Sequence, residues 1–166
     1  NFDKVYSCEI NALYYQAACN LIFNKTRESI KYPGLIENPP EMGEMIIANE
    51  DSSSFIKSIA SKLDDECMFF LDAHWYEHCP LLDELEMIAQ QELRPALIAI
   101  HDFKTNHPTQ LGYDSYNAQD FTLEWILPFV EKIYKNDWTY EYNEPDMASG
   151  ALRGIIYIKK HEAYKV

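Results

Sequence analysis

Two segments decide the fold of this chain: FFLDAHWYEH, residues 69–78, and ALIAIHDF, residues 96–103. Each begins with an apolar run of the length of a buried strand and continues into polar, chemically capable side chains. The residues that follow the two runs are Asp72, His74, Trp75, His101 and Asp102. Side chains beyond the carboxyl ends of parallel strands converge at one edge of a sheet, so the pattern predicts a site there.

Length and charge narrow the class of protein. A chain of 166 residues predicts one domain, residues 1–166, with a single core. A net charge of −13 without a basic cluster argues against a nucleic-acid partner and suits a small-molecule substrate, although surface acidity also serves solubility. No apolar run approaches the roughly 20 residues of a membrane span, and the start of the chain lacks a signal-peptide pattern. We therefore expect no membrane partner and a cytoplasmic location, with the oligomeric state open.

Short apolar runs alternate with longer amphipathic segments, which is typical of βα units. Strands are predicted over residues 4–10, 44–48, 67–71, 96–100, 138–143 and 154–159. Helices are predicted over residues 12–23, 53–63, 80–91 and 120–134, and polar loops over 27–43 and 104–118. The last two strands follow one another without a helix, so they should pair antiparallel. The predicted fold class is α/β: a Rossmann-like, doubly wound, mostly parallel sheet with a C-terminal antiparallel strand pair.

The first two strands also end in polar residues. An acid at a strand end, such as Glu9, can accept hydrogen bonds from both hydroxyls of a ribose. Asp51 with Ser52 offers an acceptor and a small hydroxyl, which suit the amino edge of an adenine. Each acid has a simpler interpretation as a helix N-cap, and that alternative stays open.

The third and fourth strand ends carry the groups for chemistry. Asp72 and Asp102 offer the oxygen ligands that a divalent metal ion prefers. His74 or His101 can complete such a site or act as a base, and Trp75 can cover a ring or a sulfonium cation. The alternatives are that each histidine makes an ordinary hydrogen bond to a loop and that Trp75 packs in the core.

The order of these elements resembles the class I S-adenosylmethionine-dependent methyltransferases, whose sheet has six parallel strands and a seventh inserted antiparallel. VYSCEIN, ANEDSSSF, FFLDAHW and IAIHDF are similar to the ends of that family's second to fifth strands, and WTYEYNE with GIIYIKK to its terminal hairpin. LDAHW followed by PLLDEL, HDF and GYDSY is nearest the branch of sugar and small-molecule O-methyltransferases.

The resemblance implies S-adenosylmethionine as cofactor and methyl transfer to an oxygen of a small polar acceptor. It implies that Glu9 holds the ribose and that Asp51 and Ser52 lie by the adenine. Asp72 would face the methyl donor, and Asp102 the acceptor. In metal-dependent members, acids at the positions of Asp72 and Asp102 bind magnesium or a similar ion. The candidate catalytic residues are Asp72, His74, His101 and Asp102.

One feature of the family has no counterpart in the sequence, the glycine-rich turn after the first strand. Either the chain is a fragment that begins at the second strand, or the domain is reduced and has lost its cofactor. Three functions therefore stay open. They are a methyltransferase, a methyltransferase-like binding module without catalysis, and a metal-dependent hydrolase that uses Asp72, His74, His101 and Asp102. The tyrosines of GYDSY are expected either to reach a substrate or to cover the sheet edge.

Overall fold

The computed structural model describes residues 3–23, 44–73, 78–106, 111–144 and 152–161. The chain divides into two units, residues 1–55 and 56–166, and the predicted single domain stays a prediction. No helix in the described ranges is long and apolar enough to cross a membrane.

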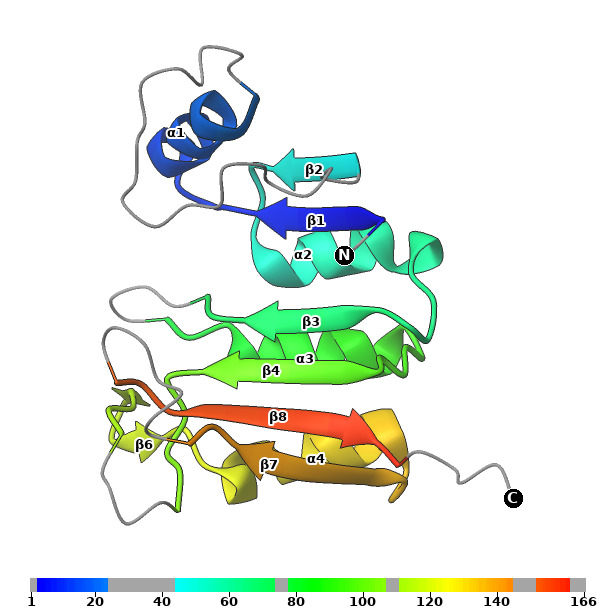
Figure 1. The fold of residues 1–166 in the computed structure, drawn as a ribbon, viewed down its shortest axis with the longest axis vertical. Coiled ribbons are helices and arrows are strands. Elements are labelled where there is room, and N and C mark those ends of the chain that lie inside the picture. Colours follow the sequence, from blue (N-terminus) through cyan, green and yellow to red (C-terminus); the bar gives the residue numbers. More distant parts are fainter. Residues whose placement is uncertain (1–2, 24–43, 74–77, 107–110, 145–151, 162–166) are drawn as a thin grey trace. The chain divides into compact units, whose positions relative to one another are not determined.

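The first unit is built on a pair of parallel strands, β1 (Lys4–Cys8) and β2 (Glu44–Ala48). Helix α1 (Ala12–Phe23) follows β1 in the chain (Figure 1). Asn11 caps α1, because its Oδ1 accepts hydrogen bonds from Leu13 N at 2.9 Å and Tyr14 N at 3.4 Å. The two predicted strands and the predicted helix are confirmed here, with β1 ending two residues earlier than predicted.

The second unit is a four-stranded sheet in the order β3-β4-β8-β7. Its strands are β3 (Met68–Leu71), β4 (Leu97–His101), β7 (Trp138–Tyr142) and β8 (Ile155–Lys160). β3 and β4 are parallel, whereas β8 lies between β4 and β7 and is antiparallel to both. The predicted antiparallel terminal pair is confirmed. The sheet as a whole is mixed, because β8 enters it beside β4 and not at its edge.

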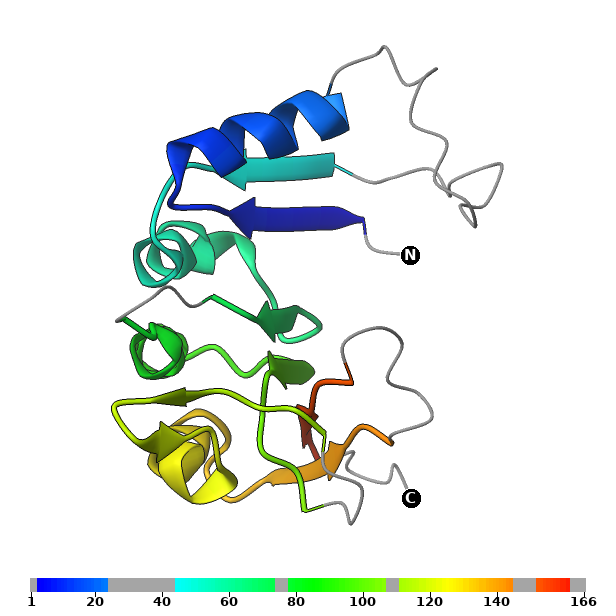
Figure 2. The same ribbon diagram turned by 90° about the vertical axis from the view of Figure 1, so that its left-hand side faces the viewer.

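Helices α3 (Leu81–Gln90) and α4 (Leu123–Tyr134) lie on the same face of this sheet (Figure 2). An ion pair between Lys132 of α4 and Glu86 of α3, at 2.6 Å, joins them. Both helices therefore cover one face of the sheet in this unit. The predicted doubly wound arrangement has helices on both faces, so the unit differs from it in this respect. The right-handed crossover from β3 through α3 to β4 places α3 on that face.

The core of the second unit lies between the sheet and these two helices. Ile98 and Ile100 of β4 and Ile156 and Ile158 of β8 are each at most 1% exposed. They alternate with residues of the other face, as the two-residue period of a strand requires. The apolar side chains of α3 and α4 complete the cluster: Leu81, Leu85, Ile88, Ile126, Val130, Ile133 and Tyr134. Burial of each such isoleucine stabilises the fold by about 2 kcal/mol.

A small hairpin replaces part of the predicted loop over residues 104–118. Its strands are β5 (Ser115–Tyr116) and β6 (Gln119–Asp120), joined by Asn117 and Ala118, both with positive φ (53° and 62°). Two consecutive left-handed residues form the turn that matches the twist of a two-residue hairpin. Because Asp120 pairs within the hairpin, α4 begins later than predicted, after its N-cap Thr122.

The four cysteines are free thiols, each partly buried. Burial raises the pKa of the Cys67 and Cys79 thiols to about 11. Both thiols therefore stay protonated at neutral pH and behave as small apolar groups.

Candidate active site

The parallel pairing of β3 with β4 brings three of the predicted site residues together. Leu71 is in register with Ile100, so Asp72 and His101 leave neighbouring strands at the same edge. His101 Nδ1 lies 2.9 Å from Asp72 Oδ1 and 3.2 Å from Asp102 Oδ1. The ligand atoms of the three residues all lie within 4.8 Å of one another. The sequence prediction that these side chains converge is therefore confirmed.

Asp102 is the buried member of this cluster. Its side chain is 7% exposed, against 44% for Asp72 and 27% for His101. Its φ of 57° is in the left-handed region, which aspartate adopts more readily than most residues but at some cost. The backbone holds this conformation, because Asp114 N donates to Asp102 O at 2.9 Å and Phe103 N donates to Gly154 O at 2.9 Å.

Arg153 joins the cluster from the residues that precede β8. Its Nε donates to Asp102 Oδ1, and its Nη2 donates to Asp114 Oδ1. The hydrogen bond to Asp102, followed by that to Asp114, raises the pKa of Arg153 further, so its charge is permanent. Sequence reasoning missed Arg153 as a residue of this site. A signal was present, because Arg153 is one of three arginines in a chain of net charge −13 and directly precedes the last predicted strand.

The arrangement determines which nitrogen of His101 is available for chemistry. Carboxylates only accept hydrogen bonds, so the two acids near Nδ1 favour the tautomer with its proton on that atom. In the neutral ring, Nε2 then carries the lone pair. His101 is thus an imidazole oriented by Asp72 and Asp102, which is the arrangement that general bases use.

The donor set does not suit magnesium, the ion that the family resemblance implied for Asp72 and Asp102. Magnesium requires near-octahedral oxygen ligands. Here one of the three available donors is an imidazole nitrogen, and Asp102 Oδ1 accepts a hydrogen bond from Arg153. The guanidinium of Arg153 already neutralises the charge of the buried Asp102 carboxylate.

Glu9, Asp51 and Ser52 belong to the first unit. Glu9 Oε1 accepts from Asn11 N at 2.8 Å, and the Asn49 amide donates to Glu9 O at 2.7 Å, which ties the end of β1 to the end of β2. Asp51 is the N-cap of α2 (Ser52–Ile59), which was the alternative to a cofactor-binding role for this acid. Ser52 Oγ is buried and has no hydrogen-bond partner among the described residues. The predicted His74 and Trp75 lie outside the described residues.

We expect Asp51→Ala to lower the free energy of unfolding by about 1 kcal/mol at neutral pH, because α2 loses its N-cap. Asp51 Oδ1 accepts from Ser54 N at 3.0 Å and from Ser53 Oγ at 2.8 Å, and these bonds lower its pKa. A lowered carboxyl pKa stabilises the fold above about pH 4 and loses that effect as the pH falls further. Urea titrations at pH 7 and pH 3 should therefore show a smaller difference at pH 3.

Asp51→Ser is the matched control, because serine caps nearly as well as aspartate. We expect its stability to stay close to that of the wild type at pH 7. An alanine variant as stable as the wild type would contradict the capping role.

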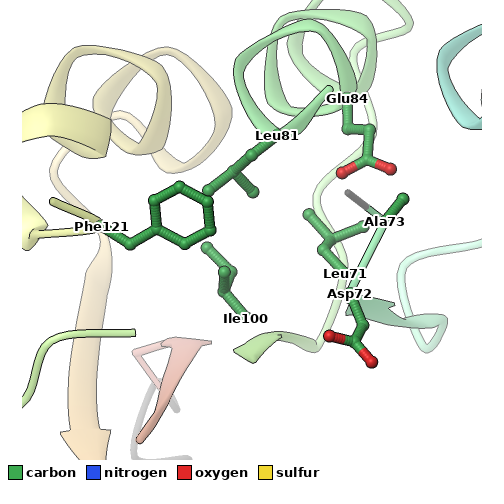
Figure 3. Close-up of a pocket in the computed structure, with 7 residues that line it drawn as sticks. All are labelled: Leu71, Asp72, Ala73, Leu81, Glu84, Ile100 and Phe121. Carbon is green, nitrogen blue, oxygen red and sulfur yellow. The ribbon is translucent and has the colours of Figure 1, made fainter. Parts of the chain in front are cut away.

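Beside the cluster lies a small hollow lined by Leu71, Leu81, Ile100 and Phe121 (Figure 3). Glu84, only 2% exposed, directs its carboxylate toward Ala73 at the end of β3, whereas the Asp72 carboxylate points away from the hollow. Sequence reasoning missed Glu84. The available signal was an acid in the apolar pattern Leu81, Glu84, Leu85 and Ile88, whose spacing is that of one buried helix face.

The tyrosines of GYDSY take different positions. Tyr116 stacks on Phe121 with ring centroids 5.7 Å apart, and Phe121 stacks on Trp125 at 5.3 Å. Desolvation raises the pKa of Tyr116. Tyr113 is 38% exposed, with Lys104 Nζ 5.0 Å from its ring centroid. Tyr116 therefore packs against the start of α4, and Tyr113 is the tyrosine that solvent reaches.

The fold is similar to that of a Clostridium thermocellum protein described as a "putative rRNA-methylase". The superposition has a TM-score of 0.50 and 11% sequence identity, and it covers 95% of this chain and 75% of that chain. No protein-family model and no curated protein matches the chain. The likeness shows a methyltransferase fold, which agrees with the family resemblance at the level of architecture.

Proposed function

We propose that this protein transfers a methyl group from S-adenosylmethionine to an oxygen of a small polar acceptor, with His101 as the general base. Two observations together carry the proposal: β8 lies antiparallel between β4 and β7, and the neighbouring ends of β3 and β4 bring Asp72, His101 and Asp102 together. A doubly wound arrangement of the whole chain is part of the same proposal. The similar fold of a methylase supports it.

When bound, S-adenosylmethionine supplies an electrophilic methyl carbon on a sulfonium. His101 Nε2 takes the proton of the acceptor hydroxyl as its oxygen becomes the nucleophile, while Asp72 and Asp102 hold the Nδ1–H of the ring. Alignment of acceptor and donor contributes much of the rate in such a reaction. In this proposal the protein's residues orient the acceptor and move one proton.

The hydroxyl of Ser52, which has no hydrogen-bond partner in the described part of the chain, supports a cofactor role for the first unit. A buried polar atom without a hydrogen bond is costly, and a ligand that supplies the partner removes that cost. Glu9 lies at the end of β1, where it is proposed to hold the ribose, and Asp51 with Ser52 lies at the end of β2, where the pair is proposed to meet the adenine. Asp72, and Trp75 with it, is proposed to face the methyl donor.

The acidity of the chain favours a small acceptor over RNA. Phosphates recruit lysine and arginine, whereas this chain has 14 of these against 27 aspartates and glutamates. A metal-dependent hydrolase is the third candidate, after the binding module without catalysis, since Asp72, His101 and Asp102 converge. The Arg153 guanidinium on Asp102 weighs against it.

Calorimetric titration of the full chain with S-adenosylhomocysteine tests the proposal. We expect micromolar binding, weakened by Ser52→Ala, because that variant removes the hydroxyl expected to contact the cofactor. Sugars and phenols are then screened as acceptors by the release of S-adenosylhomocysteine from S-adenosylmethionine. No binding by a chain that circular dichroism shows to be folded would contradict the cofactor site and favour the binding module.

A further inference from the structure

Asp102 is surrounded by N–H donors at the place where the family resemblance implied a metal ion. Its Oδ1 accepts from Arg153 Nε and lies 3.2 Å from His101 Nδ1. Its side chain is 7% exposed, so little water screens the charge. A divalent cation on this oxygen would have to displace the guanidinium or lie against it.

The shape of Arg153 suits this position. The planar guanidinium directs Nε at Asp102 and Nη2 at Asp114, which a single ammonium group cannot reproduce. Gly112 leaves space for the Arg153 side chain, because a Cβ at residue 112 would lie 3.1 Å from Arg153 Nη1.

The backbone around Arg153 is fixed by hydrogen bonds on both sides of the residue. Gly112 N donates to Leu152 O at 2.8 Å, and Gly154 N donates to Gly112 O at 2.9 Å. The guanidinium is therefore held between two acids by main-chain contacts that do not depend on a ligand.

We infer that Arg153 takes the place of a metal ion at this site: it neutralises Asp102, holds it against His101, and makes the acid–base cluster independent of divalent cations. Arg153 is thus a positioning residue. The role of Arg153 in orienting the base rests on the proposed function, whereas its effect on cation binding does not.

Manganese binding measured by electron paramagnetic resonance of the free ion tests the inference without any methyl donor. We expect the wild-type chain to bind Mn²⁺ no tighter than about 1 mM, since a guanidinium occupies the buried carboxylate. Arg153→Met should bind Mn²⁺ at least about 10-fold more tightly, because Asp102 and Asp114 lose their cation, and Asp72 and His101 stay as further donors. Adding Asp102→Asn to that variant should abolish the gain.

Three further variants complete the test. Arg153→Lys keeps the positive charge and should bind Mn²⁺ as weakly as the wild type. Arg153→Gln loses the charge but can still donate to Asp102, so it serves if the methionine variant does not fold, and it should also gain affinity. Lys132→Met removes a lysine from an exposed ion pair with Glu86 and should change nothing.

Micromolar Mn²⁺ binding by the wild type that is lost on Asp102→Asn would overturn the inference. So would folded Arg153→Met or Arg153→Gln with no gain in affinity. Failure of the proposed function would appear separately, as absent binding of S-adenosylhomocysteine with these Mn²⁺ results unchanged.

Discussion

Gly154→Ala is expected to lower the free energy of unfolding by about 3 kcal/mol or more, which corresponds to a fall in Tm of roughly 6–12 °C. A Cβ at this position would lie 2.0 Å from Phe103 O and 2.9 Å from Thr105 Cγ2. The first of these atoms belongs to the backbone, so no side-chain rotation relieves the clash. The start of β8 must move away from the segment after β4.

The same shift would disturb the site. Phe103 N donates to Gly154 O at 2.9 Å, and the neighbouring Arg153 and Asp102 form the ion pair that orients the cluster. Thermal unfolding followed by circular dichroism measures the stability. Gly112→Ala is the graded control: its Cβ would meet the Arg153 side chain at 3.1–3.2 Å, and a side chain can adjust. A Gly154→Ala protein as stable as the Gly112→Ala protein would contradict the close packing.

His101→Gln is expected to slow methyl transfer by about 10²- to 10⁴-fold while the affinity for S-adenosylhomocysteine stays unchanged. A glutamine amide can donate to Asp72 or Asp102 but cannot accept a proton at neutral pH. The variant thus keeps hydrogen bonding at the strand end and removes the base. kcat/KM measured with an acceptor that the wild type methylates gives the effect.

His78 provides the matched control for His101. It is exposed, its side chain lies 3.8 Å from Asp83, and it has no place in the cluster. His78→Gln should therefore keep wild-type kcat/KM. Asp72→Asn should cause a smaller loss than His101→Gln, because the ring keeps Asp102 as a partner at 3.2 Å. A His101→Gln rate within about 3-fold of wild type would exclude His101 as the base.

Local pattern was sufficient for most elements, and it failed where a residue without a turn signal formed a turn. The apolar runs at residues 44–48 and 96–100 became strands close to their predicted bounds, because burial of an apolar run of that length favours a strand. The hairpin over Ser115–Asp120 was missed. Its turn uses Asn117 and Ala118, and Ala118 carries no turn signal of its own.

The sequence alone predicted that Asp72, His101 and Asp102 share one sheet edge, because all three lie at the ends of apolar runs whose length favours a buried strand, and parallel strands deliver their ends to one side. Only the tertiary structure decided what neutralises Asp102. Arg153 lies 51 residues away in the chain, and it reaches the site because β8 inserts beside β4. Charge pairing in a buried place depends on distance and burial, and neither can be deduced from the order of residues.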